Sequence, residues 1–235
     1  MSFKALPLSE LLDRLESFHG SQAPSWPVDP YQFLIWWHCG YPASDQRCTR
    51  GWQALKSQIG IEPAQLLAAS QAKLTAALKA GGMVPEVRAQ RLEQIAQRVV
   101  QEFDGDLNTL FRGRIGAVRT AIKKFPGMAG PGVDRILLFA SAVPVAAVPS
   151  NCPYVPVRMM LGLEREDYSV TYREAQGLIE DAVAEEFHPR QRAYLLLKAH
   201  GQTICKRKPQ CDDCLVSTAC AYAAGKDRGG SRKKG

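Results

Sequence analysis

Four cysteines lie close together near the C-terminal end of the chain, in the segment CKRKPQCDDCLVSTAC at residues 205–220, with gaps of five, two and five residues. Four thiolates can bind a zinc ion or an iron–sulfur cluster, and structural zinc sites usually contain two closely spaced pairs. Here only the middle two cysteines form such a pair. Because a cubane is larger than one ion, single cysteines further along the chain can reach its separate irons. The spacing therefore favours a [4Fe–4S] cluster over zinc or metal-free thiols, with the ligands Cys205, Cys211, Cys214 and Cys220.

The composition is that of a globular protein with an excess of positive charge. The chain has 235 residues, with 30 Lys and Arg against 23 Asp and Glu, which gives a formal net charge of +7. This length allows one large domain or two smaller ones. The basic balance fits a polyanionic partner such as nucleic acid, but charge alone does not identify one.

The N-terminal segment and the apolar runs argue against export and membrane insertion. Charged residues at positions 4, 10 and 13 come too early for a secretory apolar core. The longest uncharged run, 136–157, contains four prolines, which a membrane-spanning helix would not carry. We therefore expect a soluble, cytoplasmic protein, associated with the nucleoid if bacterial. Thiols stay reduced in that compartment, so the three scattered cysteines are expected to be small core residues: Cys39, Cys48 and Cys152.

Helical periodicity dominates the chain. In residues 85–103 the apolar side chains recur at the three- and four-residue spacing of one helix face. Similar stripes occur at 8–18, 31–37, 50–59, 175–183 and 192–197, whereas alternating strand-like runs are scarce. The pattern predicts an all-α protein. A linker at 21–29 and a proline-rich crossover at 143–156 interrupt it, and the basic, Gly-rich segment 226–235 is predicted to be a disordered tail.

The cysteine segment resembles the C-terminal cluster of the endonuclease III and MutY-like DNA glycosylases. In that family the gaps are usually six, two and five, so the first loop is one residue shorter here. The resemblance implies a structural or redox-sensing [4Fe–4S] cluster and a first loop that contacts DNA. Lys206, Arg207 and Lys208 match the basic character of that loop. Alternatively, these three residues are an ordinary solvated turn.

The segment FRGRIGAVRTAIKKFPGMAGPGVDRILLF, residues 111–139, resembles the helix-hairpin-helix of the same superfamily. Pro126 and Gly127 match the usual turn, Ala129 replaces its second glycine, and Gly130 follows. Such turns let backbone N–H groups at a helix N-terminus approach a DNA phosphate. The alternative is a plain Pro-Gly turn between two helices. The residues predicted to contact DNA here are Gly127, Ala129, Gly130, Lys123 and Lys124.

The resemblance extends over residues 29–220 and implies an endonuclease III-like fold with two domains. Residues 29–145 would form a six-helix barrel that contains the hairpin. Residues 1–28 and 146–225 would form the iron–sulfur cluster domain. Double-stranded DNA would lie in a groove between the two domains, with one damaged base flipped into the cleft, and the protein is expected to act as a monomer.

The family's catalytic residues are missing at the matching positions. Asn151 stands in the slot of the Asp that stabilises the positive sugar, and an amide supplies no full negative charge. Pro131 stands in the slot of the Lys that forms a Schiff base in strand-cleaving members. Three further slots, for a His, an Arg and a Gln, hold Pro153, Pro156 and Pro42. Lyase activity by the family mechanism is therefore not expected.

Asp134 is the best substitute acid, since it lies three residues after Pro131 and shares its helix face. It could equally be an ordinary acid in the first turn of a helix. Asp45 is a weaker candidate. A base pocket could be lined by four residues that are otherwise core residues: His38, Tyr41, Cys152 and Tyr154.

The sequence is compatible with three functions. The first is an atypical monofunctional DNA glycosylase of base excision repair, in which Asn151 holds a water or the sugar and Asp134 supplies charge. The second is a protein that binds DNA lesions without cutting. A zinc-stabilised binding module is a third possibility, which depends on the identity of the metal.

Overall fold

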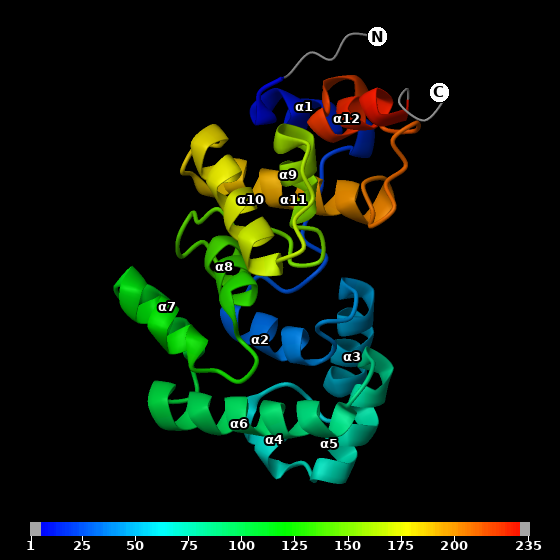
Figure 1. Cartoon of the computed structure of the whole chain (residues 1–235). Coiled ribbons are helices and arrows are strands. Elements are labelled where there is room, and N and C mark those ends of the chain that lie inside the picture. The colour runs from blue at the N-terminus through cyan, green and yellow to red at the C-terminus, as the bar shows by residue number, and fades with distance from the viewer. Residues whose placement is uncertain (1–5, 231–235) are drawn as a thin grey trace. The chain divides into compact units, whose positions relative to one another are not determined.

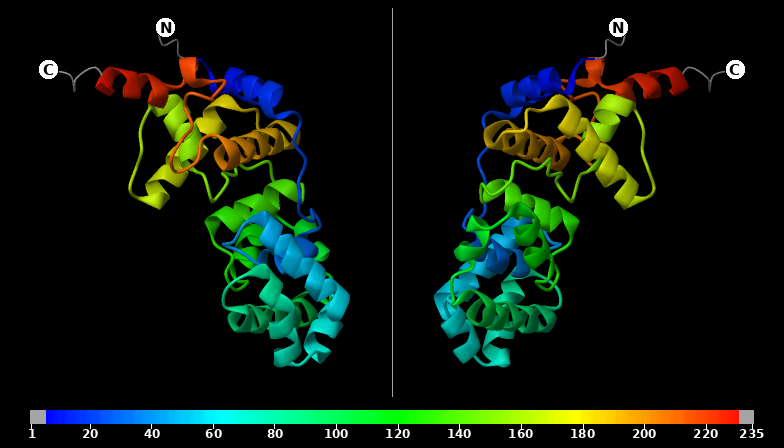
Figure 2. Two further views of the ribbon diagram at one scale, coloured as in Figure 1. Left: turned by 90° about the vertical axis from the view of Figure 1, so that its right-hand side faces the viewer. Right: turned by 90° about the vertical axis from the view of Figure 1, so that its left-hand side faces the viewer.

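The computed structural model describes residues 6–230, with side chains described as far as residue 225. Within these residues every regular element is a helix, as Figures 1 and 2 show, so the predicted all-α class is confirmed. No helix in this part of the chain is both long and apolar enough to cross a membrane. The elements are α1 Leu8–His19, α2 Pro30–His38, α3 Asp45–Gln58, α4 Pro63–Ala68, α5 Gln71–Leu78, η1 Lys79–Gly81, α6 Pro85–Phe103, η2 Leu107–Arg112, α7 Ile115–Lys123, α8 Gly130–Phe139, α9 Tyr154–Leu161, α10 Tyr168–Ala182, α11 Phe187–Thr203, η3 Ser217–Ala219 and α12 Ala221–Gly230.

Capping residues explain where the helices begin. The predicted helix at 85–103 is confirmed as α6. Two others begin earlier than their apolar stripes, α3 at Asp45 and α10 at Tyr168, because Ser44 and Asp167 accept hydrogen bonds from the first turns. The crossover is irregular up to residue 153, and α9 begins at Tyr154. The backbone of residues 226–230 continues α12, and residues 231–235 of the predicted tail lie outside the described residues.

The chain divides into two compact units. The described residues up to Ala23 and from Val143 onward form one unit, which we call the cluster unit because it contains the four clustered cysteines. Residues Pro24–Ala142 form the other, which we call the hairpin unit. The boundaries predicted from the sequence lie three to five residues further along the chain (28/29 and 145/146 against 23/24 and 142/143).

The core of the hairpin unit is built around α2. All of its residues except Gln32 are buried, and this matches a sequence, PYQFLIWWH, that is apolar on every face. Asp29 caps its first turn by accepting from the backbone N–H of Gln32. Helix α3 packs against α2 and α5, and α4 and α5 pack against α6. In the cluster unit, the apolar face of α1 packs with residues of α9, α10 and α11.

A buried arginine connects three parts of the hairpin unit. Arg135 of α8 donates from Nη2 to Oδ2 of Asp45 at 2.9 Å and from Nη1 to Oδ1 at 3.4 Å. The two side chains are only 4% and 13% exposed. The guanidinium carbon lies 3.7 Å from the ring centroid of Trp26 and 5.0 Å from that of Trp36. The ion pair and the aromatic rings therefore join α8 to the start of α3, to α2 and to the linker before α2.

Replacing Asp45 with Asn should strongly destabilise the hairpin unit, because it leaves the buried Arg135 cation without its charged partner. Removing one member of a buried pair typically costs about 3–5 kcal/mol. Urea unfolding measures the change. The matched control is Glu102→Gln, which breaks the surface pair with Arg98 in the same unit and should cost at most about 0.5 kcal/mol. Equal changes in the two variants would contradict this interpretation of the pair.

Candidate functional site

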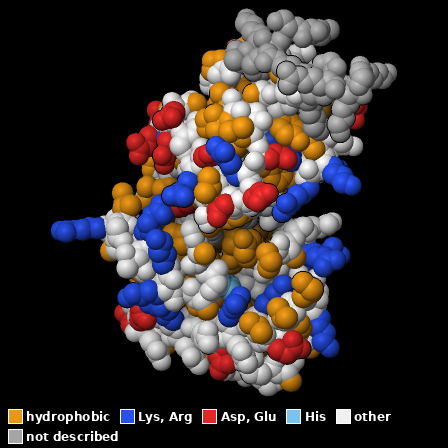
Figure 3. All heavy atoms as spheres, in the orientation of Figure 1, with side chains coloured by type: hydrophobic (Ala, Val, Ile, Leu, Met, Phe, Trp, Pro, Cys, Tyr) orange, Lys and Arg blue, Asp and Glu red, His pale blue; other side chains and the backbone are white. Residues whose placement is uncertain are grey.

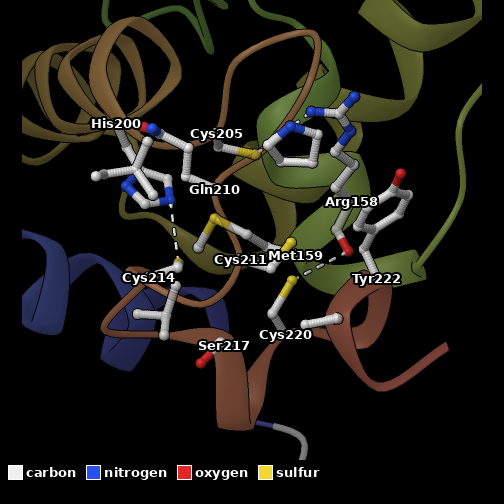
Figure 4. Close-up of a pocket in the computed structure, with 14 residues that line it drawn as sticks. Arg158, Met159, His200, Cys205, Gln210, Cys211, Cys214, Ser217, Cys220 and Tyr222 are labelled. Atoms are coloured by element: carbon white, nitrogen blue, oxygen red, sulfur yellow. Dashed lines mark hydrogen bonds between the residues drawn. The ribbon is translucent and has the colours of Figure 1, made fainter. Parts of the chain in front are cut away.

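The four clustered cysteines line one small cavity in the cluster unit. Cys205 follows the end of α11, Cys211 and Cys214 lie in the following loop, and Cys220 precedes α12. Figure 4 shows their side chains around this cavity, together with Arg158 of α9 and His200 of α11. The space accessible to the centre of a water molecule is about 20 Å³, within about 330 Å³ of space between the side chains that includes open solvent.

The surroundings of the thiols favour their protonated form when no metal is bound. Burial raises the pKa of Cys205 and Cys220, and it raises the pKa of Cys214 to about 11. A hydrogen bond from Arg158 opposes this rise at Cys205. Binding of a metal centre would convert the thiols to thiolates with release of protons.

The arrangement of the cysteines bears on which centre they could hold. Among the described residues, no three His, Cys, Asp or Glu side chains are grouped so that they could hold a metal ion. The four cysteines instead share the lining of one cavity. A zinc ion needs its sulfur ligands at about 2.3 Å from one point, which this arrangement does not provide. A cubane takes each ligand at a separate iron, so the donor set fits it better.

The first loop of the cluster directs its backbone inward and its basic side chains outward. Lys206, Arg207 and Lys208 are all exposed. The carbonyl groups of Lys206 and Arg207 accept hydrogen bonds from Arg158, at 2.6 and 3.1 Å. The three basic side chains predicted to contact DNA are therefore accessible to a partner.

The predicted hairpin is present as α7, a tight turn and α8 (Figure 1). Gly127 has a φ of +68°, which favours glycine. Ala129 precedes α8 without capping it through its side chain, and Gly130 is the first helical residue. Lys123 and Lys124 are exposed at the end of α7. The turn thus combines an uncapped helix N-terminus with nearby cations, which is the arrangement that binds phosphate.

His38 is a buried residue that contacts the backbone of the hairpin turn. It is buried, its Nδ1 lies 2.7 Å from the carbonyl oxygen of Leu34, and its Nε2 lies 2.5 Å from that of Pro126. Burial lowers the pKa of His38 more than these two carbonyl groups raise it. Tyr41 stacks on Trp37 at 3.7 Å between ring centroids. Both side chains therefore pack within the hairpin unit.

Three of the residues predicted to act in catalysis, in the base pocket or in DNA contact line one open pocket of the cluster unit. Asn151, Tyr154 and Arg207 come from the crossover, from α9 and from the cluster loop. The space accessible to the centre of a water molecule is about 300 Å³. Cys152, by contrast, is buried in the core, where its Sγ lies 3.9 Å from the carbonyl oxygen of Leu197. The remaining lining residues are Ser150, Pro153, Arg165, Glu166, Tyr168 and Thr171.

The fold is similar to solved structures of DNA glycosylases over most of the chain. An endonuclease III in a non-covalent complex with DNA has a TM-score of 0.75 and 16% identity, covering 94% of this chain and 97% of that chain. A thermostable thymine-DNA glycosylase has a TM-score of 0.70 and 19% identity, covering 92% and 96%. The 3-methyladenine DNA glycosylase of H. pylori, bound to 1,N6-ethenoadenine, has a TM-score of 0.58 and 19% identity, covering 84% and 95%. The chain has the fold of endonuclease III.

This likeness confirms the resemblance drawn from the cysteines and the hairpin at the level of the fold. The sequence itself matches no protein-family model and no curated protein. On the face shown in Figure 3, Lys and Arg side chains occur on both units of the endonuclease III-like fold, interspersed with hydrophobic surface. The fold alone does not define the reaction, which depends on the side chains of this chain.

The two acids proposed from the sequence both form ion pairs within the hairpin unit. Asp134 is 3% exposed and accepts a hydrogen bond from Nη1 of Arg119 at 2.7 Å. This pair joins α8 to α7 and so holds the two helices of the hairpin together. Asp134 lies in the second turn of α8, so the first-turn interpretation does not describe it either. Asp45 is held by Arg135.

Several residues that contact the cluster loop, line the pocket of Asn151 or are exposed at an apolar tip were not predicted from the sequence. Arg158 contacts the cluster loop, and Glu166 lines the pocket of Asn151. Met83 and Val84 are neighbouring apolar residues before α6, 79% and 58% exposed. Periodicity could not reveal Arg158 or Glu166, because the first is an isolated charge within an apolar helix and the second lies in a charged run between two helices. The segment GGMVP, with apolar residues between glycine and proline, is the local signal for an exposed apolar tip.

Gly127→Ala should destabilise the hairpin, because Gly127 has a positive φ and an added Cβ would lie 3.2 Å from His38 Nε2 and from Arg91 Nη1. We expect a loss of about 1–2 kcal/mol in unfolding free energy from backbone strain. Gly130→Ala is the matched control, since its Cβ would meet nothing within 4 Å and its φ is not positive. Thermal unfolding compares the two. A control that is as unstable as Gly127→Ala would show that this turn geometry is wrong.

Proposed function

We propose that this protein is a monofunctional DNA glycosylase that hydrolyses the bond between a damaged or mismatched base and its sugar in double-stranded DNA, in base excision repair. The observation that carries the proposal is the match of 94% of the chain to an endonuclease III solved with DNA. The hairpin turn and the cluster loop supply basic, exposed side chains in both units of this fold. A DNA partner is also consistent with the predicted cytoplasmic location; the predicted monomeric state stays a prediction.

The proposed DNA contacts divide between backbone and side chains. N–H groups at the start of α8 and the lysines at the end of α7 would bind phosphates, as would the cluster loop. The exposed tip at Met83 and Val84 fits the apolar wedge with which many proteins unstack a base step. Unstacking is required because a glycosylase must take the base out of the duplex.

We assign the reacting sugar to the pocket lined by Asn151. Its amide can hold a water or a sugar hydroxyl but carries no charge. Among the described residues that line this pocket, Glu166 carries the carboxylate. We propose that Glu166, in place of Asp134, stabilises the positive sugar as the base leaves. Pro131 offers no amine for a Schiff base, so the strand should stay intact.

We further propose that Cys205, Cys211, Cys214 and Cys220 hold a [4Fe–4S] cluster. The shared cavity and the cysteine spacing support this choice over zinc. The cluster would fix the loop that carries Lys206, Arg207 and Lys208. It supplies a redox-active, negatively charged centre to which the protein contributes burial and hydrogen bonds.

Anaerobically purified protein should be brown, with broad visible absorption and with iron and inorganic sulfide in equal amounts. Cys211→Ser should remove most of the colour, since the cluster loses one of its four thiolates. Cys48→Ser, at a buried cysteine of the hairpin unit, is the matched control and should keep it. A colourless protein that contains zinc would overturn the cofactor assignment.

Incubation with duplexes that each carry one modified base should leave abasic sites in at least one of them, detected as strand breaks after alkali. Glu166→Gln should lower the rate about 100-fold or more, as the loss of a group that stabilises developing charge does. Glu180→Gln, an exposed acid of α10, is the control and should be neutral. Asn151→Asp should raise the rate, because it adds a carboxylate to the pocket.

The alternative function is a protein that binds DNA lesions without cutting them. The ion pairs of Asp45 and Asp134 favour it, because they occupy both acids that the sequence offered for catalysis. Tight, salt-dependent binding with no abasic sites on any duplex would establish this alternative. Strand breaks without alkali would contradict both functions.

A further inference from the structure

Arg158 is a buried cation that contacts both the cluster cysteines and the backbone of the cluster loop. Its side chain is 3% exposed. Nη1 lies 3.6 Å from Sγ of Cys205 and 2.6 Å from the carbonyl oxygen of Lys206. Nη2 donates to the carbonyl oxygen of Arg207 at 3.1 Å. The remaining partner is Glu164, whose Oε1 accepts from Nε at 2.7 Å and also from Nη2.

Aromatic rings and a second cysteine complete the surroundings of Arg158. The guanidinium carbon lies 4.3 Å from the ring centroid of Tyr154 and 5.1 Å from that of Tyr222. The thiol of Cys220 lies 3.7 Å from the main-chain oxygen of Arg158. One residue therefore touches two of the four cysteines, and Figure 4 shows its side chain beside the cavity that they line.

Arg158 already pairs with one carboxylate, and a bound cluster would place further negative charge beside it. A buried cation is costly unless it is paired and hydrogen-bonded. Glu164 pairs with it, but that side chain is 49% exposed, so water screens part of its charge. Neutral thiols add nothing to the balance, whereas a cluster bound by four thiolates is anionic. The planar fork of the guanidinium can bond to a sulfur and to two carbonyl groups at once, which a lysine cannot do.

We propose that Arg158 is a positioning residue that couples the cluster to the DNA-contacting loop. It holds the backbone of Lys206 and Arg207 and stabilises the Cys205 thiolate, so the basic side chains of the loop are presented to DNA when the cluster is bound. The coupling rests on the proposed cluster and on the proposed DNA binding. Because Arg158 is buried, its replacement can affect DNA binding only through the residues that it contacts, of which the loop backbone is the part that carries the exposed basic side chains.

Arg158→Met in the cluster-loaded protein tests the proposal, with Arg192→Met as control. Arg192 is also an ion-paired arginine of the cluster unit, bound to Asp13 and Glu16. We expect Arg158→Met to move the reduction potential of the cluster to a more negative value, because the reduced cluster loses a nearby cation and a hydrogen bond. The control should keep the wild-type potential.

The salt dependence of duplex binding reports how many phosphate contacts the loop makes. Loss of the three loop phosphate contacts should lower the slope of log K against log salt by about two to three. Arg158→Met should approach the slope of a variant in which Lys206, Arg207 and Lys208 are all alanine. Combining the two changes should lower the slope no further, as expected when both act on one set of contacts.

Arg158→Lys separates charge from geometry and also serves if the Met variant does not fold. Lysine keeps the positive charge but cannot bond to the sulfur and both carbonyl groups. Its reduction potential should therefore stay near the wild-type value, while trypsin should cut faster after Lys206 and Arg207 and the salt slope should fall. A Lys variant with wild-type cleavage and slope would overturn the positioning role.

The outcomes distinguish this inference from the proposed function. If the wild-type protein binds no duplex, the proposed function fails, but the potential and the tryptic cleavage still measure the action of Arg158. If the wild-type protein holds no iron–sulfur cluster, the coupling is overturned. If Arg158→Met leaves the potential, the cleavage and the slope unchanged while DNA binding persists, the inference alone is overturned.

Discussion

The ion pair of Arg135 with Asp45 is the interaction on which the hairpin unit depends. It places a full positive charge among aromatic rings, where only a matched carboxylate and the ring faces can compensate for lost water. Arg135 lies on α8, the helix whose N-terminus forms the hairpin turn. Because the pair fixes α8 against α2 and α3, it also fixes where that turn lies within the unit. The position of the proposed phosphate site therefore depends on the buried charge of Arg135, which does not contact the phosphate itself.

Two other buried arginines also connect separate segments of the chain, in their case through hydrogen bonds to backbone carbonyl groups. Arg88 donates to the carbonyl groups of Cys39 and Gly40 just after α2, and Arg190 donates to those of Val183 and Ala184 just after α10. Carbonyl groups at a helix C-terminus lack intrahelical partners, and a guanidinium can satisfy two of them at once. Arg158 differs because it satisfies the carbonyl groups of a loop and also meets a thiol. That difference is why we infer a functional role for it alone.

Features that extend over many residues could be predicted from the sequence, whereas contacts made by single residues could not. The apolar stripe of α6, the hairpin and the all-α class follow from patterns over many residues, and they are confirmed. Helices α4 and α5 have only six and eight residues, too few for a clear stripe. The partner of Asp134 lies fifteen residues away on another helix, and no local pattern marks such a pair. Likewise, no local pattern places Glu166 in the pocket that Asn151 lines.

The distribution of carboxylates bears on how such a chain could keep glycosylase chemistry without the usual aspartate. Asp134 is buried and Asp45 is half-buried, and their cations make each of them a poor source of negative charge for a substrate. An exposed glutamate in an open pocket pays little desolvation in the free protein, and it gains strength only when a bound base and sugar exclude water. A carboxylate at Glu166 would therefore stabilise the positive sugar most strongly once the bound substrate has displaced water from the pocket, whose lining also includes the cluster-loop residue Arg207.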